Sequence, residues 1–128
     1  MKVPLRTLFF RGVELVSGNQ LRLLQSGAEF FPALIAAIEA ARTEIHLETY
    51  IFNADPSTEA VRDGLIRAAR RGVRVCLLID GVGSRELPAA WLDALKAAGA
   101  SVLLYRPLMG RGWRSNPRNL RRLHRKLA

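Results

Sequence analysis

Cysteine and histidine are scarce in this chain of 128 residues, which contains one cysteine, Cys76, and two histidines, His46 and His124. A single cysteine cannot form an internal disulfide, and its isolation fits a reducing compartment. The histidines and the cysteine are also too far apart in sequence to match the ligand spacing of a structural zinc site. These shortages exclude a disulfide-stabilised secreted module and a zinc-binding motif.

Long hydrophobic runs are missing as well. No stretch reaches the roughly 18 uninterrupted apolar residues that a helix needs to cross a bilayer. Near the start, Arg11 and Glu14 interrupt an apolar run that is too short for a signal peptide. We therefore expect any membrane contact to be peripheral; residues 5–10 would either dip into an interface or form a poorly packed terminus.

Acidic residues stop at Asp93. Up to that position the chain contains 11 basic and 11 acidic residues, whereas the remainder contains 9 basic residues and no acidic one. The entire net charge of +9 thus lies in the C-terminal part. Such a block typically contacts phosphate-bearing partners, which are lipid headgroups or nucleic acid, although it could also serve solubility or form a flexible arm.

The periodicity of apolar residues predicts alternating strands and helices in one domain. Strands are expected at residues 21–24, 44–52, 73–79 and 101–105, with helices near 27–41, 57–71 and 88–98 between them. This order predicts an α/β fold with a parallel or mixed sheet flanked by helices. The nearly continuous apolar character of residues 73–79 predicts a strand that is buried on both faces.

Two carboxylates stand out at strand positions. Glu48 lies in an alternating strand between His46 and Tyr50, and burying a carboxylate there requires a partner. Asp80 begins a glycine-containing loop at the carboxyl end of the next strand, where open parallel sheets bind their ligands. Asp80 is therefore a candidate orienting carboxylate, and for Ser84 in the same loop we expect a helix cap rather than a chemical role. A plain glycine turn is the alternative for this loop.

The last residues form a strongly basic segment. If residues 123–128 are extended, His124 and Lys126 point to the same face. An imidazole can attack phosphorus or carry a proton near neutral pH, and an ammonium can hold phosphate oxygens. The alternative is that both are polar residues of a solvated tail.

Three segments together resemble a known family. LHRKL at residues 123–127 is similar to the opening of the His-x-Lys-x4-Asp signature of the phospholipase D superfamily. LETYIF at 47–52 and LIDGVGS at 78–84 are similar to the corresponding segments of bacterial cardiolipin synthases. The resemblance predicts an N-terminal extension at residues 1–18 and an incomplete phospholipase D-like half-domain at 19–128. The aspartate of the signature would fall three residues after Ala128, so we expect the chain to be truncated.

The resemblance implies phosphodiester transfer through a phosphohistidine. His124 would be the nucleophile, Lys126 would hold the phosphate, and Glu48 would accept a hydrogen bond from the imidazole or a nearby cation. The donor would be a phosphatidylglycerol-like phospholipid, no metal or other cofactor would be needed, and the missing C-terminal half would supply a second motif. The fragment alone is therefore expected to be inactive. A phospholipase or nuclease of the same superfamily, and a non-catalytic anionic-surface binding module, remain alternatives.

A basic, irregular loop precedes the final segment. Its candidate phosphate- or membrane-binding residues, together with two that follow, are Arg111, Trp113, Arg114, Arg118, Arg121 and Arg122. Arginine and tryptophan side chains together suit an anionic membrane surface. They would also suit single-stranded nucleic acid, although we expect a lipid surface rather than nucleic acid as the partner. The expected location is the cytoplasmic side of a bacterial cell membrane, bound peripherally.

Overall fold

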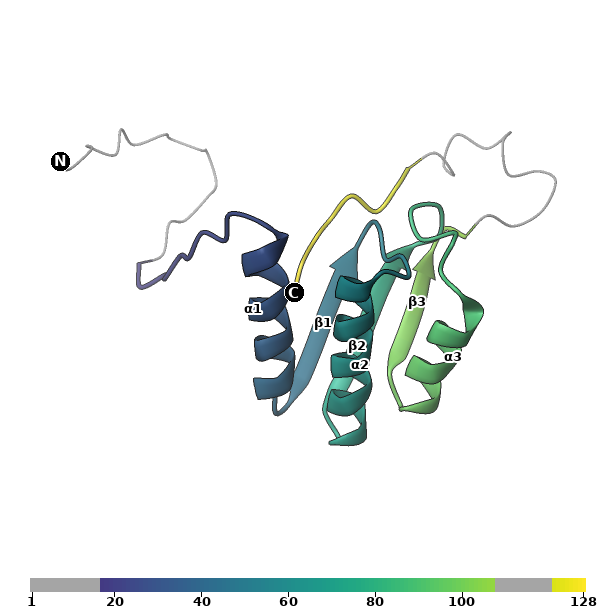
Figure 1. Ribbon diagram of the computed structural model, residues 1–128, viewed down its shortest axis with the longest axis horizontal. Helices are drawn as coiled ribbons and strands as arrows, with labels where there is room; N and C mark the ends of the chain where they lie inside the picture. Colours follow the sequence, from purple (N-terminus) through teal and green to yellow (C-terminus); the bar gives the residue numbers. More distant parts are fainter. Residues whose placement is uncertain (1–16, 108–120) are drawn as a thin grey trace.

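The computed structural model describes residues 17–107 and 121–128. Helices and strands alternate along this part of the chain (Figure 1). In chain order the elements are α1 (Gly27–Ala40), β1 (Glu44–Thr49), α2 (Pro56–Arg70), β2 (Arg74–Asp80), α3 (Ala89–Ala97) and β3 (Ser101–Tyr105).

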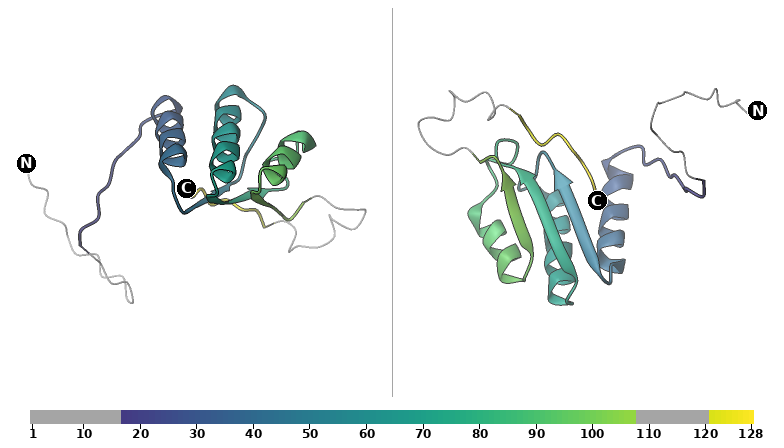
Figure 2. Two further views of the ribbon diagram at one scale, coloured as in Figure 1. Left: turned by 90° about the horizontal axis from the view of Figure 1, so that it is seen from below. Right: turned by 180° about the vertical axis from the view of Figure 1, so that it is seen from behind.

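The three strands form one parallel sheet in the order β1-β2-β3. All three helices cover the same face of this sheet, as the view along its edge shows (Figure 2). Parallel strands need crossover connections, which α2 and α3 provide. The expected α/β class is confirmed, and the carboxyl ends of the strands meet at one edge because the register pairs Thr49 with Ile79 and Asp80 with Tyr105.

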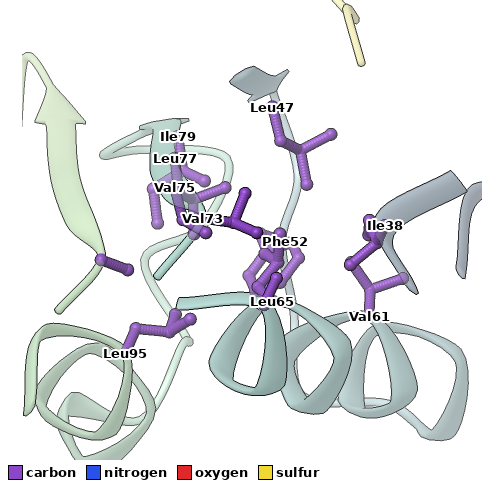
Figure 3. Packing of buried hydrophobic residues seen from close by; sticks show 12 residues of the cluster. Ile38, Leu47, Phe52, Val61, Leu65, Val73, Val75, Leu77, Ile79 and Leu95 are labelled. Carbon is purple, nitrogen blue, oxygen red and sulfur yellow. The ribbon is translucent and has the colours of Figure 1, made fainter. Parts of the chain in front are cut away.

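The hydrophobic core lies between the sheet and the helices (Figure 3). Leu65 of α2 and Leu95 of α3 are fully buried against Val75, Leu77 and Ile79 of β2. Alternate residues of a strand face one side, so β2 contributes three apolar side chains to a single layer. Burial of this layer fixes the sheet beneath the helices.

The start of α2 is fixed by its own sequence. The side chain of Asp55 accepts hydrogen bonds from the backbone N–H of Ser57 (2.9 Å) and Thr58 (3.0 Å), and Thr58 Oγ1 accepts one from the Asp55 N–H (3.2 Å). This reciprocal capping satisfies N–H groups that a helix leaves unpaired. The hydrogen bond from the Thr58 N–H, partly offset by desolvation, lowers the pKa of Asp55.

The strand expected at residues 21–24 is absent from the described part of the chain. Leu21 is 97% exposed and Leu23 is 83% exposed, in a segment that extends away from the sheet (Figure 1). Strand conformation requires a hydrogen-bonding neighbour, which local alternation of side chains does not supply. The prediction of a strand there was wrong because the segment has no such neighbour in this arrangement.

The prediction that residues 73–79 are buried on both faces was also wrong. Val75, Leu77 and Ile79 are buried, but Cys76 and Leu78 are only half-buried. The reason is that α1, α2 and α3 all pack on one face, so within residues 17–107 and 121–128 no helix covers the other face of β2 (Figure 2).

Replacing Leu65 by alanine should lower the free energy of unfolding by about 2–5 kcal/mol, since it leaves a cavity beneath a fully buried position. The matched substitution Leu21→Ala should change it by less than about 0.5 kcal/mol. Urea unfolding followed by circular dichroism measures both values. Similar losses for the two variants would contradict this assignment of the core.

Candidate functional site

The C-terminal segment 121–128 passes the carboxyl ends of the strands and reaches the outer edge of β1 (Figure 1). There Leu127 and Glu48 form an antiparallel bridge: the Leu127 N–H donates to the Glu48 carbonyl (3.0 Å), and the Glu48 N–H donates to the Leu127 carbonyl (2.8 Å). Residues near the chain's end are thereby attached to the sheet. Residues that are far apart in the sequence, at the end of the chain and in β1, therefore lie together at this edge of the sheet.

A second attachment comes from Asp80, whose side chain is fully buried at the end of β2. One carboxylate oxygen accepts hydrogen bonds from the N–H groups of Val82 (2.8 Å) and Gly83 (3.1 Å). The other oxygen accepts one from the N–H of Leu123 (2.8 Å). Asp80 thus joins the glycine loop to the residue that immediately precedes His124.

Burial alone would raise the pKa of Asp80, because desolvation disfavours the charged carboxylate. The hydrogen bonds from Leu123, Val82 and Gly83, together with the nearby charge of Arg122, outweigh this effect and lower the pKa below its ordinary value. Asp80 is therefore a buried anion at neutral pH. Its orienting role was predicted from its place at the strand end, and the structure shows which groups it contacts.

The glycine loop 81–84 supports the turn after β1. Ser84 is buried, and its hydroxyl donates to the Tyr50 carbonyl (3.3 Å) while it accepts from the Phe52 N–H (2.9 Å). A side chain at position 83 would collide with the Tyr50 carbonyl, so only glycine fits there. The expectation that Ser84 caps a helix was wrong, because α3 begins after Pro88 and Ser84 instead satisfies backbone groups of the β1–α2 turn.

His124 and Lys126 project to the same side of their segment. The imidazole lies edge-on to the Tyr50 ring, with ring centroids 5.2 Å apart and planes at 60°. The Lys126 ammonium lies 5.9 Å from the centre of the same ring and donates to the His124 carbonyl (3.1 Å). Both side chains are exposed, so each is accessible to a ligand.

Glu48 contacts a cation of the same segment. Its carboxylate lies 3.4 Å from the Arg125 guanidinium, and its side chain is 22% exposed. Glu48 meets Arg125 rather than the imidazole of His124, which corresponds to the cation alternative of the prediction. An ion pair with one exposed partner contributes little stability.

The predicted basic residues fall into two groups. Four of them, Arg111, Trp113, Arg114 and Arg118, lie outside the described residues. Arg121 is exposed, whereas Arg122 is half-buried, with its guanidinium 3.4 Å from both an Asp80 carboxylate oxygen and the Arg106 carbonyl.

Beside Lys126 lies an apolar groove of about 210 Å³. Its walls come from α1, β1, α2 and the C-terminal segment, and include Phe30, Phe31, Leu34, Ile51, Phe52 and Lys126. Among residues 17–107 and 121–128, no three His, Cys, Asp or Glu side chains are grouped so that they could hold a metal ion. Nor does this described part contain a helix long and apolar enough to cross a membrane.

Tyr50 is the residue of this site that sequence reasoning missed. The alternation of β1 had placed it beside Glu48, but a tyrosine near a strand end is usually a packing residue. Its signal was positional, since it follows β1 at the same sheet edge where Asp80 ends β2.

Replacing Asp80 by asparagine should lower the free energy of unfolding at neutral pH by about 1–3 kcal/mol, since an amide cannot accept all of these hydrogen bonds. The folded-state pKa lies below 3.8, so the stabilisation is complete above 3.8 and is lost as the pH falls through the folded-state pKa. The difference between wild type and variant should therefore narrow toward low pH in denaturant titrations.

Asp93→Asn, at an exposed position on α3, is the matched control and should behave like wild type. Asp55 and Glu39 also have lowered pKa values. Wild type and Asp80→Asn both contain these two residues, so the difference in their free energies of unfolding reports on Asp80. A difference that stays constant down to about pH 3 would contradict the role of an ionised Asp80.

Comparison with known proteins adds to this geometry. Residues 34–128 match the family described as "Cardiolipin synthase, PLD-like domain". Cardiolipin synthase B of Salmonella typhimurium is 40% identical over 114 residues, which is 87% of this chain and 27% of that protein. Cardiolipin synthase B of Escherichia coli K12 is 38% identical over 113 residues, again 87% of this chain and 27% of that protein.

A relative of lower identity gives a similar result. Cardiolipin synthase 1 of Bacillus anthracis is 35% identical over 119 residues, or 93% of this chain and 23% of that protein. No solved structure matches. The chain spans about a quarter of the length of these curated relatives. On the family match and these identities, the chain belongs to the phospholipase D-like family of cardiolipin synthase domains.

Proposed function

We propose that this chain forms the first part of a phosphatidyltransferase that transfers a phosphodiester through a phosphohistidine on His124. The observation that carries the proposal is the placement of His124 and Lys126 on one side of a segment attached at both ends. Asp80 holds Leu123 on one side of the pair, and Glu48 binds Leu127 on the other. A nucleophile and a cation on one anchored backbone segment suit phosphoryl transfer, in which positioning and charge stabilisation dominate.

In the proposed reaction an imidazole nitrogen of His124 attacks the phosphorus of a phospholipid, and a P–N bond forms as the P–O bond to the leaving alcohol breaks. Lys126 holds the non-bridging oxygens, on which negative charge is concentrated. A second histidine, from the part of the relatives that this chain does not span, would protonate the leaving alcohol. An acceptor alcohol then displaces the imidazole from phosphorus.

The proposed donor is a phosphatidylglycerol-like phospholipid, the acceptor is a second lipid alcohol, and the site is the surface of a bacterial membrane on its cytoplasmic side. The names of the relatives support this substrate class. The block of 9 basic residues without an acidic one supports an anionic surface. The same chemistry with water as acceptor would make a phospholipase, and with a nucleic acid as donor a nuclease.

A chimera tests this function. The 128 residues are joined to the portion of the Salmonella cardiolipin synthase B that follows the matched region, and the purified protein is incubated with labelled phosphatidylglycerol. We expect cardiolipin to form. His124→Asn should reduce the rate at least about a thousandfold, because the nucleophile is lost. Phosphatidic acid as the only product would indicate a phospholipase, and cleavage of an oligonucleotide a nuclease.

His46→Asn is the matched control, because His46 is exposed on β1 near Glu44 and has no place in the proposed reaction. It should keep the rate within about threefold. The 128-residue chain alone should form no cardiolipin. A folded chimera that forms cardiolipin equally well with and without His124 would contradict the proposal.

Membrane binding provides a separate prediction. The 128-residue chain should co-sediment with vesicles that contain phosphatidylglycerol and be released by high salt. Replacing Arg111, Arg114 and Arg118 by glutamine should weaken binding on the order of a hundredfold, at about 1 kcal/mol for each basic residue at the surface.

The control for this measurement replaces three arginines outside the basic C-terminal block, Arg42, Arg70 and Arg85, which changes the net charge equally. It should weaken binding far less. Equal losses in the two triple variants would show that net charge alone, rather than the segment around residues 111–118, determines binding.

A further inference from the structure

We infer that Tyr50 is a positioning residue of this site, whose ring fixes the His124 imidazole and the Lys126 ammonium relative to each other. The inference rests on the proposed function for its purpose, but its geometric content can be tested on the 128-residue chain itself. Tyr50 was not among the residues predicted from sequence.

The ring of Tyr50 contacts both members of the pair. Its edge-to-face geometry with the imidazole, at 5.2 Å and 60°, is the arrangement that the charge distribution of aromatic rings favours. The Lys126 ammonium, at 5.9 Å from the ring centroid, lies at the outer limit of a cation–π contact. One ring thus contacts both His124 and Lys126, which are separated in sequence by Arg125.

Tyr50 is itself supported by the loop after β2, through contacts of Gly83 and Ser84. Ser84 donates to its carbonyl, and Gly83 packs so closely against its backbone and ring that no side chain fits at position 83. Ser84 is buried, and it belongs to the loop that Asp80 closes through Val82 and Gly83. The close approach of Gly83 therefore restricts the position of the ring that His124 and Lys126 contact.

Such a support is needed because the backbone attachments do not orient side chains. Asp80 and Glu48 hold Leu123 and Leu127, but the imidazole and the ammonium between them are exposed. Exposed side chains sample several rotamers, and a displacement of about 1 Å at a reacting group costs on the order of a hundredfold in rate. A rigid ring beside both groups restricts them to orientations in which they can act on the same phosphate.

The ring, rather than the hydroxyl, carries this role, because the contacts are with the aromatic system. Tyr50→Phe should therefore behave like wild type, whereas Tyr50→Leu, which keeps an apolar side chain without the ring, should not. Tyr50→Met serves as a second ring-free variant if Tyr50→Leu does not fold. Amide spectra of each variant establish that the fold is intact.

The first measurement is geometric and uses NMR of the 128-residue chain. In wild type and Tyr50→Phe, the imidazole C–H resonances of His124 should carry a ring-current shift. In the ring-free variants this shift should vanish, while the resonances of His46 stay unchanged. His124 resonances that are the same with and without the ring would overturn the inference.

The second measurement is chemical and uses phosphoramidate, which phosphorylates histidine. The imidazole nitrogen bonds to phosphorus as the P–N bond of the reagent breaks and ammonia leaves. The rate at His124 should exceed the rate at His46 on the order of tenfold, because Lys126 and Tyr50 act only at His124. Removing the ring should abolish this advantage without changing the rate at His46, and phenylalanine should retain it.

An unchanged rate at His124 in the ring-free variants would also overturn the inference. The two hypotheses fail separately. If the ring-free variants lose the ring-current shift but the chimera forms no phosphodiester product, Tyr50 remains the support of the pair and the proposed function is refuted. If the chimera is active but the His124 resonances and phosphorylation rate of the 128-residue chain are the same with and without the ring, the proposed function stands and the role of Tyr50 is refuted.

Discussion

The buried carboxylate of Asp80 is the interaction on which this sheet edge depends. A buried charge is tolerated only when its oxygens are hydrogen-bonded, and Asp80 obtains these bonds from two different segments, the loop after β2 and the residue before His124. Any arrangement without Leu123 in place would leave one oxygen of a fully buried carboxylate without that partner. The C-terminal segment therefore helps to stabilise the buried carboxylate at the end of β2.

The second attachment, between Leu127 and Glu48, fixes the direction in which the segment runs from Leu123. Between the two attachments lie His124, Arg125 and Lys126. In an extended segment these alternate, so that the imidazole and the ammonium share one side and the guanidinium takes the other. The contacts agree with this alternation, because His124 and Lys126 both reach Tyr50 whereas Arg125 reaches Glu48.

The sequence predicted the parts of the fold that depend on local pattern. Helical spacing of apolar residues located α1, α2 and α3, and apolar runs located β1, β2 and β3, since burial on one face imposes those periods. It failed where the result depends on neighbours. The alternation at residues 21–24 could not reveal that no strand of the described part of the chain lies beside them. The apolar run of β2 could not reveal that the described helices all cover the same face of the sheet.

The site shows the same division. His124 and Lys126 could be placed on one side from strand alternation, and Asp80 could be placed at the edge from its position after a buried strand. The partners of Ser84 and the role of Tyr50 could not be inferred, because both depend on how close the loops after β1 and β2 come to each other. The glycines of the loop after β2 indicated such an approach, since a glycine permits close approach of another backbone.

The distribution of charge follows from the same geometry. Two carboxylates beside a phosphate site would oppose anion binding if they faced the ligand. Here Asp80 lies near Arg122 and Glu48 lies near Arg125, so each carboxylate has a guanidinium beside it. Because alternation directs Arg125 away from Lys126, the ion pair of Glu48 does not involve the ammonium. The two acids thus hold the segment in place while the charge of Lys126 remains directed toward the side that it shares with His124.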